Sequence, residues 1–390
     1  MSPVKRAETI KEHEIKETSM SSMTSARGDI GGSSPTRTMK AFVMREIGKV
    51  GIIDKPIPRP GPNDAILRTT AALICTSDTH TVAGAIGPRT DITLGHEAVG
   101  VVHELGDAVA AAGRFKVGQR VAVNAITPCY HCDNCQRGYS SQCGGMLGGW
   151  KFANVKDGSM AEYFHVNDAL ANLAPIPDGL TDEQAAYCCD MLSTGFIGAE
   201  HGNIPLGGTV AVFGQGPVGL MATVGARLLG AGFVIAVETM PNRIAMAKRY
   251  GADAIVDFAK EDPVEAIKRL TGGEGVDTAI EALGAANTFA ACISVTRPGG
   301  TISNIGYHGD GDTVPIPRLD WGVGMSDKTI RTALCPGGSE RMTRLMSLIV
   351  NKRVDPLAMT SHRFRFGEIE RAFRMMQTKE DGMIKPLITF

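Results

Sequence analysis

Residues Val210–Leu220 read VAVFGQGPVGL, and this stretch decides the fold. A short apolar run ends at Gly214, and Gly216 and Gly219 complete the pattern G-x-G-x-x-G. Met221–Gly230 follow with helical spacing of their apolar residues. This order of strand, glycine turn and helix is the context in which the pattern predicts a dinucleotide-binding unit.

Each position of the glycine turn has its own physical task. Gly214 allows the tight turn, Gly216 lets a pyrophosphate approach the backbone, and Gly219 lets helix and strand pack closely. Pro217 and Val218 belong to the same expected cofactor-binding turn, and the N-terminus of the helix that follows attracts the anion. The turn therefore predicts where a cofactor's phosphates bind.

A second apolar run, Phe233–Val237, ends at Glu238, which lies 19 residues beyond Gly219. An acidic residue at the end of the second strand can accept hydrogen bonds from both ribose hydroxyls of an adenosine. With the glycine turn, this acid predicts a Rossmann-type cofactor domain.

The composition is that of a soluble globular protein of two domains. The chain has 390 residues, of which 43% are hydrophobic and 21% charged. A net charge of −1 gives no general attraction to nucleic acid or to an anionic membrane. No apolar run is long enough to span a bilayer, and the N-terminus lacks the apolar core of a signal peptide. We therefore expect a cytoplasmic protein.

The residue pattern changes along the chain. Residues 1–38 are polar and mixed in charge, and we expect a disordered extension. Residues 39–191 contain short β-runs between Gly and Pro turns, which predicts a partly barrel-like β domain. Residues 192–334 alternate strands with helices, which predicts a doubly wound parallel sheet. Residues 335–390 end in a strand, and we expect this tail to return to the first domain. The expected fold class is thus α/β with a discontinuous β-rich domain. The expected strands of the parallel sheet are Thr209–Phe213, Val234–Val237, Ala254–Val256, Thr278–Glu281 and Gly300–Ile305.

Four of the nine cysteines lie in one lobe, residues 128–144. They read C-x2-C-x2-C-x7-C and are Cys129, Cys132, Cys135 and Cys143. Four thiolates at such spacing can surround one tetrahedral Zn²⁺ and leave no position for water, so the ion would staple a loop. The alternatives are an iron–sulfur cluster and four reduced thiols without an ion. Without a secretory signal, clustered cysteines favour a metal over disulfides.

Three further residues stand far apart in short motifs: Cys75 in ICTSDTH, His96 in LGHEAVG and Asp190 in CCDMLSTG. Their spacing alone indicates no site, because a buried cysteine is usually part of a core and an isolated histidine is usually structural.

The chain from residue 39 to residue 390 resembles the zinc-dependent medium-chain alcohol dehydrogenases. Within them it is most similar to the microbial secondary-alcohol (isopropanol-type) enzymes. The motifs that carry the resemblance occur in both domains and in the family's order: ICTSDTH, LGHEAVG, GGMLGGWKFANVKDG, EYFHVNDA, DMLSTGFIGAE, GQGPVGLM, SNIGYHGDGD and LCPGG. The resemblance implies a GroES-like catalytic domain, a Rossmann cofactor domain and a homotetramer.

The resemblance also implies a catalytic zinc held by Cys75, His96 and Asp190. Glu97 matches a carboxylate beside the metal, and Asp78 matches an acid that holds His96 by its other ring nitrogen. A thiolate, an imidazole and a carboxylate leave Zn²⁺ one open position for a substrate oxygen. With the cysteine lobe, this predicts two zinc ions per chain.

Asp190 stands where many relatives of the wider superfamily have a second cysteine. The adjacent Cys188 and Cys189 are therefore alternative ligands, but the isopropanol-type enzymes have Asp at this point.

The chain departs from several similar enzymes after the second cofactor strand. Those enzymes read Gly-Ser-Arg and use it to hold the phosphate of NADP, whereas this chain reads Glu238, Thr239 and Met240. Because Glu238 would repel a 2′-phosphate, we expect NAD to be preferred. Arg243, one turn further on, leaves modest use of NADP open.

The implied reaction is the reversible oxidation of a secondary alcohol to a ketone, with hydride transfer to NAD. Ser77 and His80 match positions that pass the alcohol proton towards solvent. The rivals are a polyol, threonine or primary-alcohol dehydrogenase on the same scaffold and, more remotely, a non-catalytic NAD-binding protein. By resemblance the substrate pocket is formed by Ala125, Ile126, Trp150, Tyr307, Leu334 and Cys335.

Overall fold

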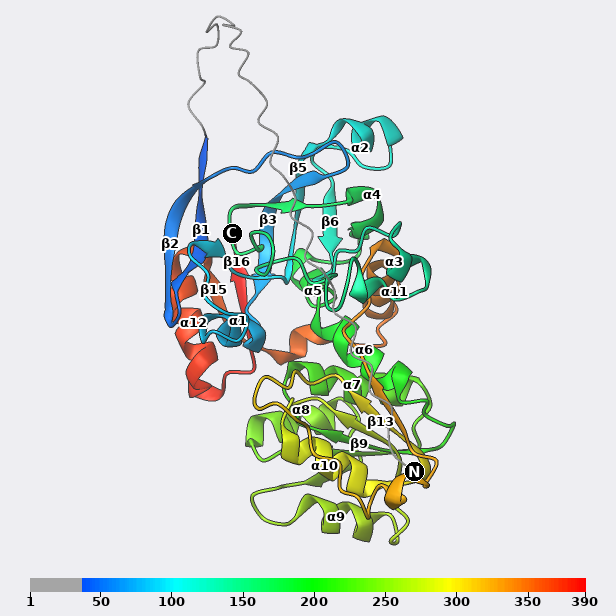
Figure 1. Cartoon of the computed structure of the whole chain (residues 1–390). Helices are drawn as coiled ribbons and strands as arrows, with labels where there is room; N and C mark the ends of the chain where they lie inside the picture. The colour runs from blue at the N-terminus through cyan, green and yellow to red at the C-terminus, as the bar shows by residue number, and fades with distance from the viewer. Residues whose placement is uncertain (1–36) are drawn as a thin grey trace, which may run out of the picture. The chain divides into compact units, whose positions relative to one another are not determined.

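Strand β9 (Thr209–Phe213) lies inside a six-stranded sheet with the order β11-β10-β9-β12-β13-β14. Each neighbouring pair in this sheet is parallel, and Val210 of β9 pairs with Val234 of β10. Figure 1 shows helices on both sides of this sheet, so the central strands read as continuous apolar runs. The other strands are β10 (Phe233–Val237), β11 (Ala254–Val256), β12 (Val276–Glu281), β13 (Thr296–Asn304) and β14 (Thr329–Thr332).

The helices of this region follow the predicted alternation, with one difference. Helix α7 begins at Pro217, four residues before the helical spacing becomes visible in the sequence. Gly216 caps this helix and proline suits its first position, where no backbone N–H donor is needed. The helices are α6 (Met191–His201), α7 (Pro217–Leu228), α8 (Pro241–Arg249), α9 (Pro263–Leu270) and α10 (Ala286–Val295).

The computed structural model describes residues 37–390, which form one compact unit. The extension expected at residues 1–38 thus lies outside the described residues, except for its last two. Of these, Thr38 already belongs to strand β1 (Thr38–Glu46), so the expected boundary was one residue too late.

The β-rich part contains two sheets. The smaller has the order β2-β1-β4, and the larger has the order β15-β16-β3-β5-β6-β8, with β7 also paired to β3. Its strands are β2 (Lys49–Pro56), β3 (Ala65–Leu73), β4 (Ile92–Thr93), β5 (Ala98–Leu105), β6 (Arg120–Val123), β7 (Tyr163–Val166), β8 (Leu173–Pro175), β15 (Thr360–Arg365) and β16 (Lys385–Thr389). The helices of the β-rich part and of the C-terminal tail are α1 (Thr76–Val82), α2 (Asp107–Ala112), α3 (Asp133–Gln136), α4 (Ala169–Asn172), α5 (Asp182–Ala186), α11 (Ser339–Val350) and α12 (Ile369–Thr378).

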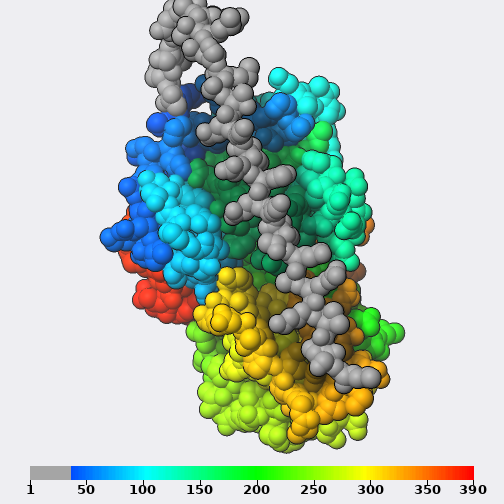
Figure 2. All heavy atoms as spheres, viewed as in Figure 1, coloured from blue at the N-terminus to red at the C-terminus, as the bar shows by residue number. Residues whose placement is uncertain are grey.

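The C-terminal tail returns to this β-rich part, as the predicted fold class requires. Leu387 of β16 pairs antiparallel with Leu73 of β3, and Phe373 of α12 packs edge-on against Phe42 of β1 with ring centroids 5.5 Å apart. Figure 2 shows the C-terminal residues in red beside the early strands in blue. The α/β fold with a discontinuous β-rich domain is therefore confirmed.

Within the described residues, no helix has both the length and the apolar character needed to cross a membrane.

Candidate active site

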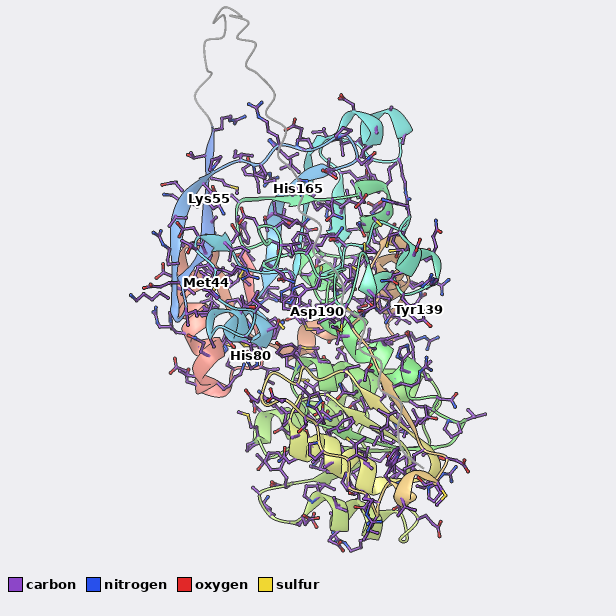
Figure 3. The ribbon with its side chains drawn as sticks, in the orientation of Figure 1. Met44, Lys55, His80, Tyr139, His165 and Asp190 are labelled. Carbon is purple, nitrogen blue, oxygen red and sulfur yellow. The ribbon has the colours of Figure 1, made fainter. Side chains whose placement is uncertain are left out.

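Side chains from three separate segments converge where the β-rich part meets the parallel sheet. Cys75 precedes α1, His96 precedes β5, and Asp190 immediately precedes α6. One ligand atom from each of these residues and from Glu97 lies within 4.8 Å of the others. The carboxylate Oδ2 of Asp190 is 3.3 Å from His96 Nε2 and 3.9 Å from Cys75 Sγ. Figure 3 labels Asp190 at this junction.

Asp78 fixes the orientation of this cluster from behind. Its carboxylate accepts hydrogen bonds from the backbone N–H groups of Cys75, at 2.8 Å, and Gly95, at 3.2 Å. Its Oδ1 lies 3.4 Å from Nδ1 of His96, so Nε2 of the same ring faces the cluster. One buried carboxylate thus positions two of the converging side chains.

Glu97 forms a fully buried ion pair with Lys385 of β16. The ammonium Nζ lies 2.7 Å and 3.0 Å from the two carboxylate oxygens, while Oε1 is 3.9 Å from His96 Nε2. Lys385 is 1% exposed and Glu97 also 1%, so the returning tail places a cation directly behind the cluster.

The charged groups of the cluster shift one another's pKa values. Burial alone would lower the pKa of His96, but the charge of Asp78 and the hydrogen bond to Asp190 raise it well above its usual value. Burial likewise opposes ionisation of Asp190, yet its interactions with His96 hold the pKa of this carboxyl below its usual range. Burial raises the pKa of Glu97 to about 7 despite the opposing charge of Lys385. The carboxylates of Asp78 and Asp190 thus stabilise positive charge on the His96 ring between them.

The donor set suits a catalytic zinc ion. Sulfur, imidazole nitrogen and carboxylate oxygen are the ligand types that Zn²⁺ takes, and three of them leave a fourth tetrahedral position. Thr194 donates a hydrogen bond of 2.6 Å to Oδ1 of Asp190, which leaves Oδ2 directed at Cys75 and His96.

The four-cysteine lobe forms a second compact set of sulfur atoms. The Sγ atoms of Cys129, Cys132, Cys135 and Cys143 all lie within 4.8 Å of one another, and the chain's cysteines are free thiols. Zn–S bonds of about 2.3 Å would place tetrahedral ligands roughly 3.8 Å apart, which fits this spread. Several iron atoms would hold the thiolates further apart, so the compact set favours a single ion.

Backbone donors surround these sulfur atoms. Hydrogen bonds from the N–H groups of Cys135 and Gly144 lower the pKa of Cys132 to about 6, whereas burial raises the pKa of Cys135 to about 12. The N–H of Cys129 donates to Sγ of Cys143 at 3.3 Å. A bound cation would favour the thiolate form at all four positions, so these thiols fit a metal.

The glycine turn has the predicted geometry. Gly214 has φ +85°, in the left-handed region that favours glycine. A Cβ on Gly219 would lie 1.8 Å from the carbonyl oxygen of Gly214, so only glycine fits there. A Cβ on Gly216 would meet no atom of the described residues within 4 Å, which leaves the space over the helix N-terminus open to a ligand.

Glu238 lies at the end of β10 and is 4% exposed. Its carboxylate accepts hydrogen bonds from the N–H groups of Gln215, at 3.1 Å, and Thr239, at 2.9 Å. Met240 N–H donates at 3.1 Å, and Arg243 Nη1 lies 3.5 Å away. The chain therefore holds this acid in place beside the glycine turn, with Arg243 as its ion-pair partner.

A cavity of about 1150 Å³ joins the metal-ligand cluster to the glycine turn. Cys75, His96 and Asp190 line one end, whereas Glu97 and Gly219 do not line it. At the other end it is lined by Gly214, Gly216, Pro217, Val218, Glu238 and Arg243. The predicted pocket residues Ala125, Ile126, Trp150, Tyr307, Leu334 and Cys335 all line it as well.

Ser77 and His80 line this cavity from α1. Ser77 Oγ lies 3.4 Å from Nε2 of His96, beside the converging ligands. His80, labelled in Figure 3, is one turn further along α1 and is exposed, so its ring can exchange protons with solvent.

Two lysines of the C-terminal tail also line the cavity and were not predicted. Lys379 has its Nζ 3.2 Å from Thr76 Oγ1, and burial lowers its pKa to about 8. Lys385 is the first residue of the apolar final strand β16, and a charge in a buried strand is a signal that sequence reasoning could have used. Lys379 lies in a polar segment and carries no such signal.

The chain matches two family descriptions. "Alcohol dehydrogenase GroES-like domain" matches residues 61–178, and "Zinc-binding dehydrogenase" matches residues 217–351. The chain therefore belongs to the zinc-binding, medium-chain alcohol dehydrogenases.

Named relatives place it nearer to one group of that family. It is 53% identical to the NADP-dependent isopropanol dehydrogenase of Thermoanaerobacter brockii, covering 90% of this chain and 99% of the relative. It is 48% identical to the enzyme of the same name from Entamoeba histolytica, covering 90% and 96%. Among solved structures, alcohol dehydrogenase TADH from Thermus sp. ATN1 aligns with a TM-score of 0.81 and 31% identity, covering 90% of this chain and 99% of that one. The chain is thus a zinc alcohol dehydrogenase related to the isopropanol-type enzymes.

Proposed function

We propose that this chain oxidises secondary alcohols to ketones, reversibly, with NAD as the preferred hydride acceptor. The observation that carries the proposal is the convergence of Cys75, His96 and Asp190 at the inner end of a cavity whose other end is the glycine turn. The similarity to isopropanol dehydrogenases supports secondary alcohols as the substrate class.

Cys75, His96 and Asp190 would hold the catalytic zinc, with Glu97 beside it, and the cysteine lobe would hold a structural one. A Zn²⁺ ion at the first site would act as a Lewis acid that polarises the substrate oxygen and lowers the pKa of the alcohol. The Ser77 hydroxyl both accepts and donates protons, so it can take the alcohol proton, and the exposed ring of His80 can release a proton to solvent.

The preference for NAD is proposed from the surroundings of Glu238. A 2′-phosphate beside this buried carboxylate would place two anions together, and Arg243 is already paired with it. Phe258, which lines the same cavity and is 52% exposed, offers no hydrogen-bond donor to a phosphate. The named isopropanol relatives are NADP-dependent, so this chain would differ from them in cofactor.

The apolar wall argues for a secondary alcohol over a polyol or an amino acid. Ile126, Trp150 and Leu334 present no charge to the substrate, whereas several hydroxyl groups would need polar partners there. Small Ala125 and bulky Trp150 both line the cavity, and their difference in size fits the small and large substituents of a methyl ketone.

A substrate panel tests the proposed function. Purified protein is assayed with 2-propanol, 2-butanol, ethanol, sorbitol and threonine, each with NAD and with NADP. We expect the highest kcat/KM with the secondary alcohols and NAD. Turnover of sorbitol or threonine in preference to 2-butanol would assign the chain to a rival class, and no turnover by zinc-loaded protein would favour a non-catalytic scaffold.

The remaining expectations are proposals of the same kind. We propose that the first domain begins with β1 at Thr38 and extends to residue 191, that the cofactor domain spans 192–334 and that the returning tail spans 335–390. We also propose a homotetrameric assembly and a cytoplasmic location. Light scattering of the purified protein measures the assembly directly.

A further inference from the structure

Three segments that line the cavity form what we call the substrate wall: Ala125–Ile126, Leu147–Trp150 and Leu334–Cys335. All three are tied to the four-cysteine lobe. The first, Ala125–Ile126, runs through Thr127 and Pro128 directly into Cys129. The second, Leu147–Trp150, begins four residues after Cys143. The chain therefore passes from the wall into the lobe at Cys129 and returns to the wall after Cys143.

The segment that enters the lobe (the outgoing arm, residues 125–128) and the segment that leaves it (the return arm, residues 147–150) are paired with each other at the wall. Ile126 and Trp150 form an antiparallel bridge, and the N–H of Thr127 donates to the carbonyl of Gly149 at 3.0 Å. A Cβ on Gly149 would lie 2.7 Å from Cγ2 of Ile126 and 2.7 Å from the carbonyl oxygen of Ser141. The two arms thus meet too closely for any side chain at this position.

The return arm depends on the lobe for its conformation. Leu147 lines the cavity with φ +59°, an uncommon backbone conformation for a leucine. Its N–H donates to the side chain of Gln142 at 2.7 Å, and the N–H of Gly149 donates to Ser141 at 3.1 Å. Gln142 and Ser141 are the residues just before Cys143, so the fourth cysteine holds the segment that shapes this wall.

The third wall segment, Leu334–Cys335, is tied to the lobe through Tyr130. The hydroxyl of Tyr130 donates to the carbonyl of Gly337 at 2.7 Å, and Tyr130 directly follows Cys129. A Cβ on Gly337 would lie 1.9 Å from the carbonyl oxygen of Ile126, so this segment also packs against the first one.

The lobe has no apolar core that could hold this arrangement by itself. Among the described residues, the hydrophobic clusters include none of positions 128–149. Its regular structure consists of α3 and one 3-10 turn, Ser140–Gln142, and its aromatic Tyr139 is exposed at the periphery (Figure 3). The converging thiols are therefore the feature that can fix the lobe, through an ion bound to them.

We propose that the zinc ion of the four-cysteine lobe sets the shape of the substrate wall, which makes Cys129 and Cys143 positioning residues for substrate specificity. This proposal rests on the proposed function, because it takes the cavity beside the lobe as the alcohol site. Loss of the lobe's ion releases Leu147 and Trp150 and loosens the binding of the alcohol or ketone. The cofactor end of the cavity, built on the parallel sheet, is unaffected.

The chain has two tryptophans, so Trp321→Phe leaves Trp150 as the only tryptophan and a direct reporter on the wall. In that background, Cys132→Ser removes one lobe ligand that does not line the cavity. Cys292→Ala, in α10, is the matched control because it also removes one thiol but lies outside the lobe. Each protein is measured for zinc content, acrylamide quenching of Trp150, cofactor affinity, and kcat and KM for 2-butanone.

We expect Cys132→Ser to lose one zinc ion per chain and the control to lose none. Quenching of Trp150 should rise at least about twofold and the KM for 2-butanone about tenfold, because small displacements near a substrate are costly. Cofactor affinity should stay within about twofold of its original value.

Gly149→Ala keeps all four cysteines and separates wall shape from metal content, even where the cysteine variant fails to fold. We expect it to retain both zinc ions and still raise Trp150 quenching and the KM for 2-butanone. Loss of the lobe's zinc with unchanged quenching and KM would overturn the proposal, as would wild-type protein whose lobe binds no zinc. Quenching needs no turnover, so failure of the proposed function would be seen separately.

Discussion

Replacement of Glu238 by alanine should narrow the preference for NAD over NADP. Like unit charges about 4 Å apart near a protein surface repel by about 4 kcal/mol. Arg243, 3.5 Å from the carboxylate, cancels part of this, which leaves about 3 kcal/mol, or on the order of a hundredfold in cofactor preference. In the variant, the freed guanidinium of Arg243 can instead approach the 2′-phosphate.

The assay is kcat/KM for each cofactor at saturating 2-propanol. We expect the wild-type protein to favour NAD by about a hundredfold, and Glu238→Ala to gain efficiency with NADP while losing it with NAD. Glu274→Ala, an exposed acid away from the cavity, is the matched control and should leave the ratio unchanged. A wild-type preference for NADP, or an unchanged ratio in Glu238→Ala, would refute the reasoning.

Three further predictions concern polar groups that are buried or half-buried. Lys385→Met should lower the free energy of unfolding, measured by urea denaturation, by about 3–5 kcal/mol, because it removes the ammonium partner of the buried Glu97. Adding Glu97→Gln to this variant should restore more than half of the lost free energy. Burial lowers the pKa of His165, so the unfolded state binds a proton first and stability falls as pH drops below about 6.5. His165→Gln should therefore lose less stability than wild type between about pH 7.5 and 5.5, and an equal loss would contradict this assignment. Asp78→Asn should weaken zinc binding beside His96 by about 10- to 100-fold in a chelator competition, and unchanged affinity would exclude its orienting role.

The cofactor domain was predictable because its signals are local. The left-handed turn at Gly214 and the close approach at Gly219 are requirements of three consecutive elements, so they appear in a short sequence pattern. Glu238 marks the end of the next strand for the same reason. The sixth strand, Thr329–Thr332, was not predicted because it is a short edge strand without an apolar alternation.

The metal-ligand cluster could not be predicted from spacing. Cys75, His96 and Asp190 meet through long-range folding, and only their motifs, by resemblance to a family, indicated that they belong together. The cation behind Glu97 comes from Lys385, 288 residues away, and no local pattern encodes that contact. The link from Tyr130 to Gly337 is hidden in the sequence for the same reason.

Zinc analysis of wild-type protein and of Asp190→Ala, by elemental mass spectrometry with a parallel assay of 2-propanol oxidation, tests the central claim most directly. The proposed site predicts two zinc ions per chain in the wild type, and one ion with loss of activity in the variant. An Asp190→Ala protein that keeps both ions and full activity would contradict it.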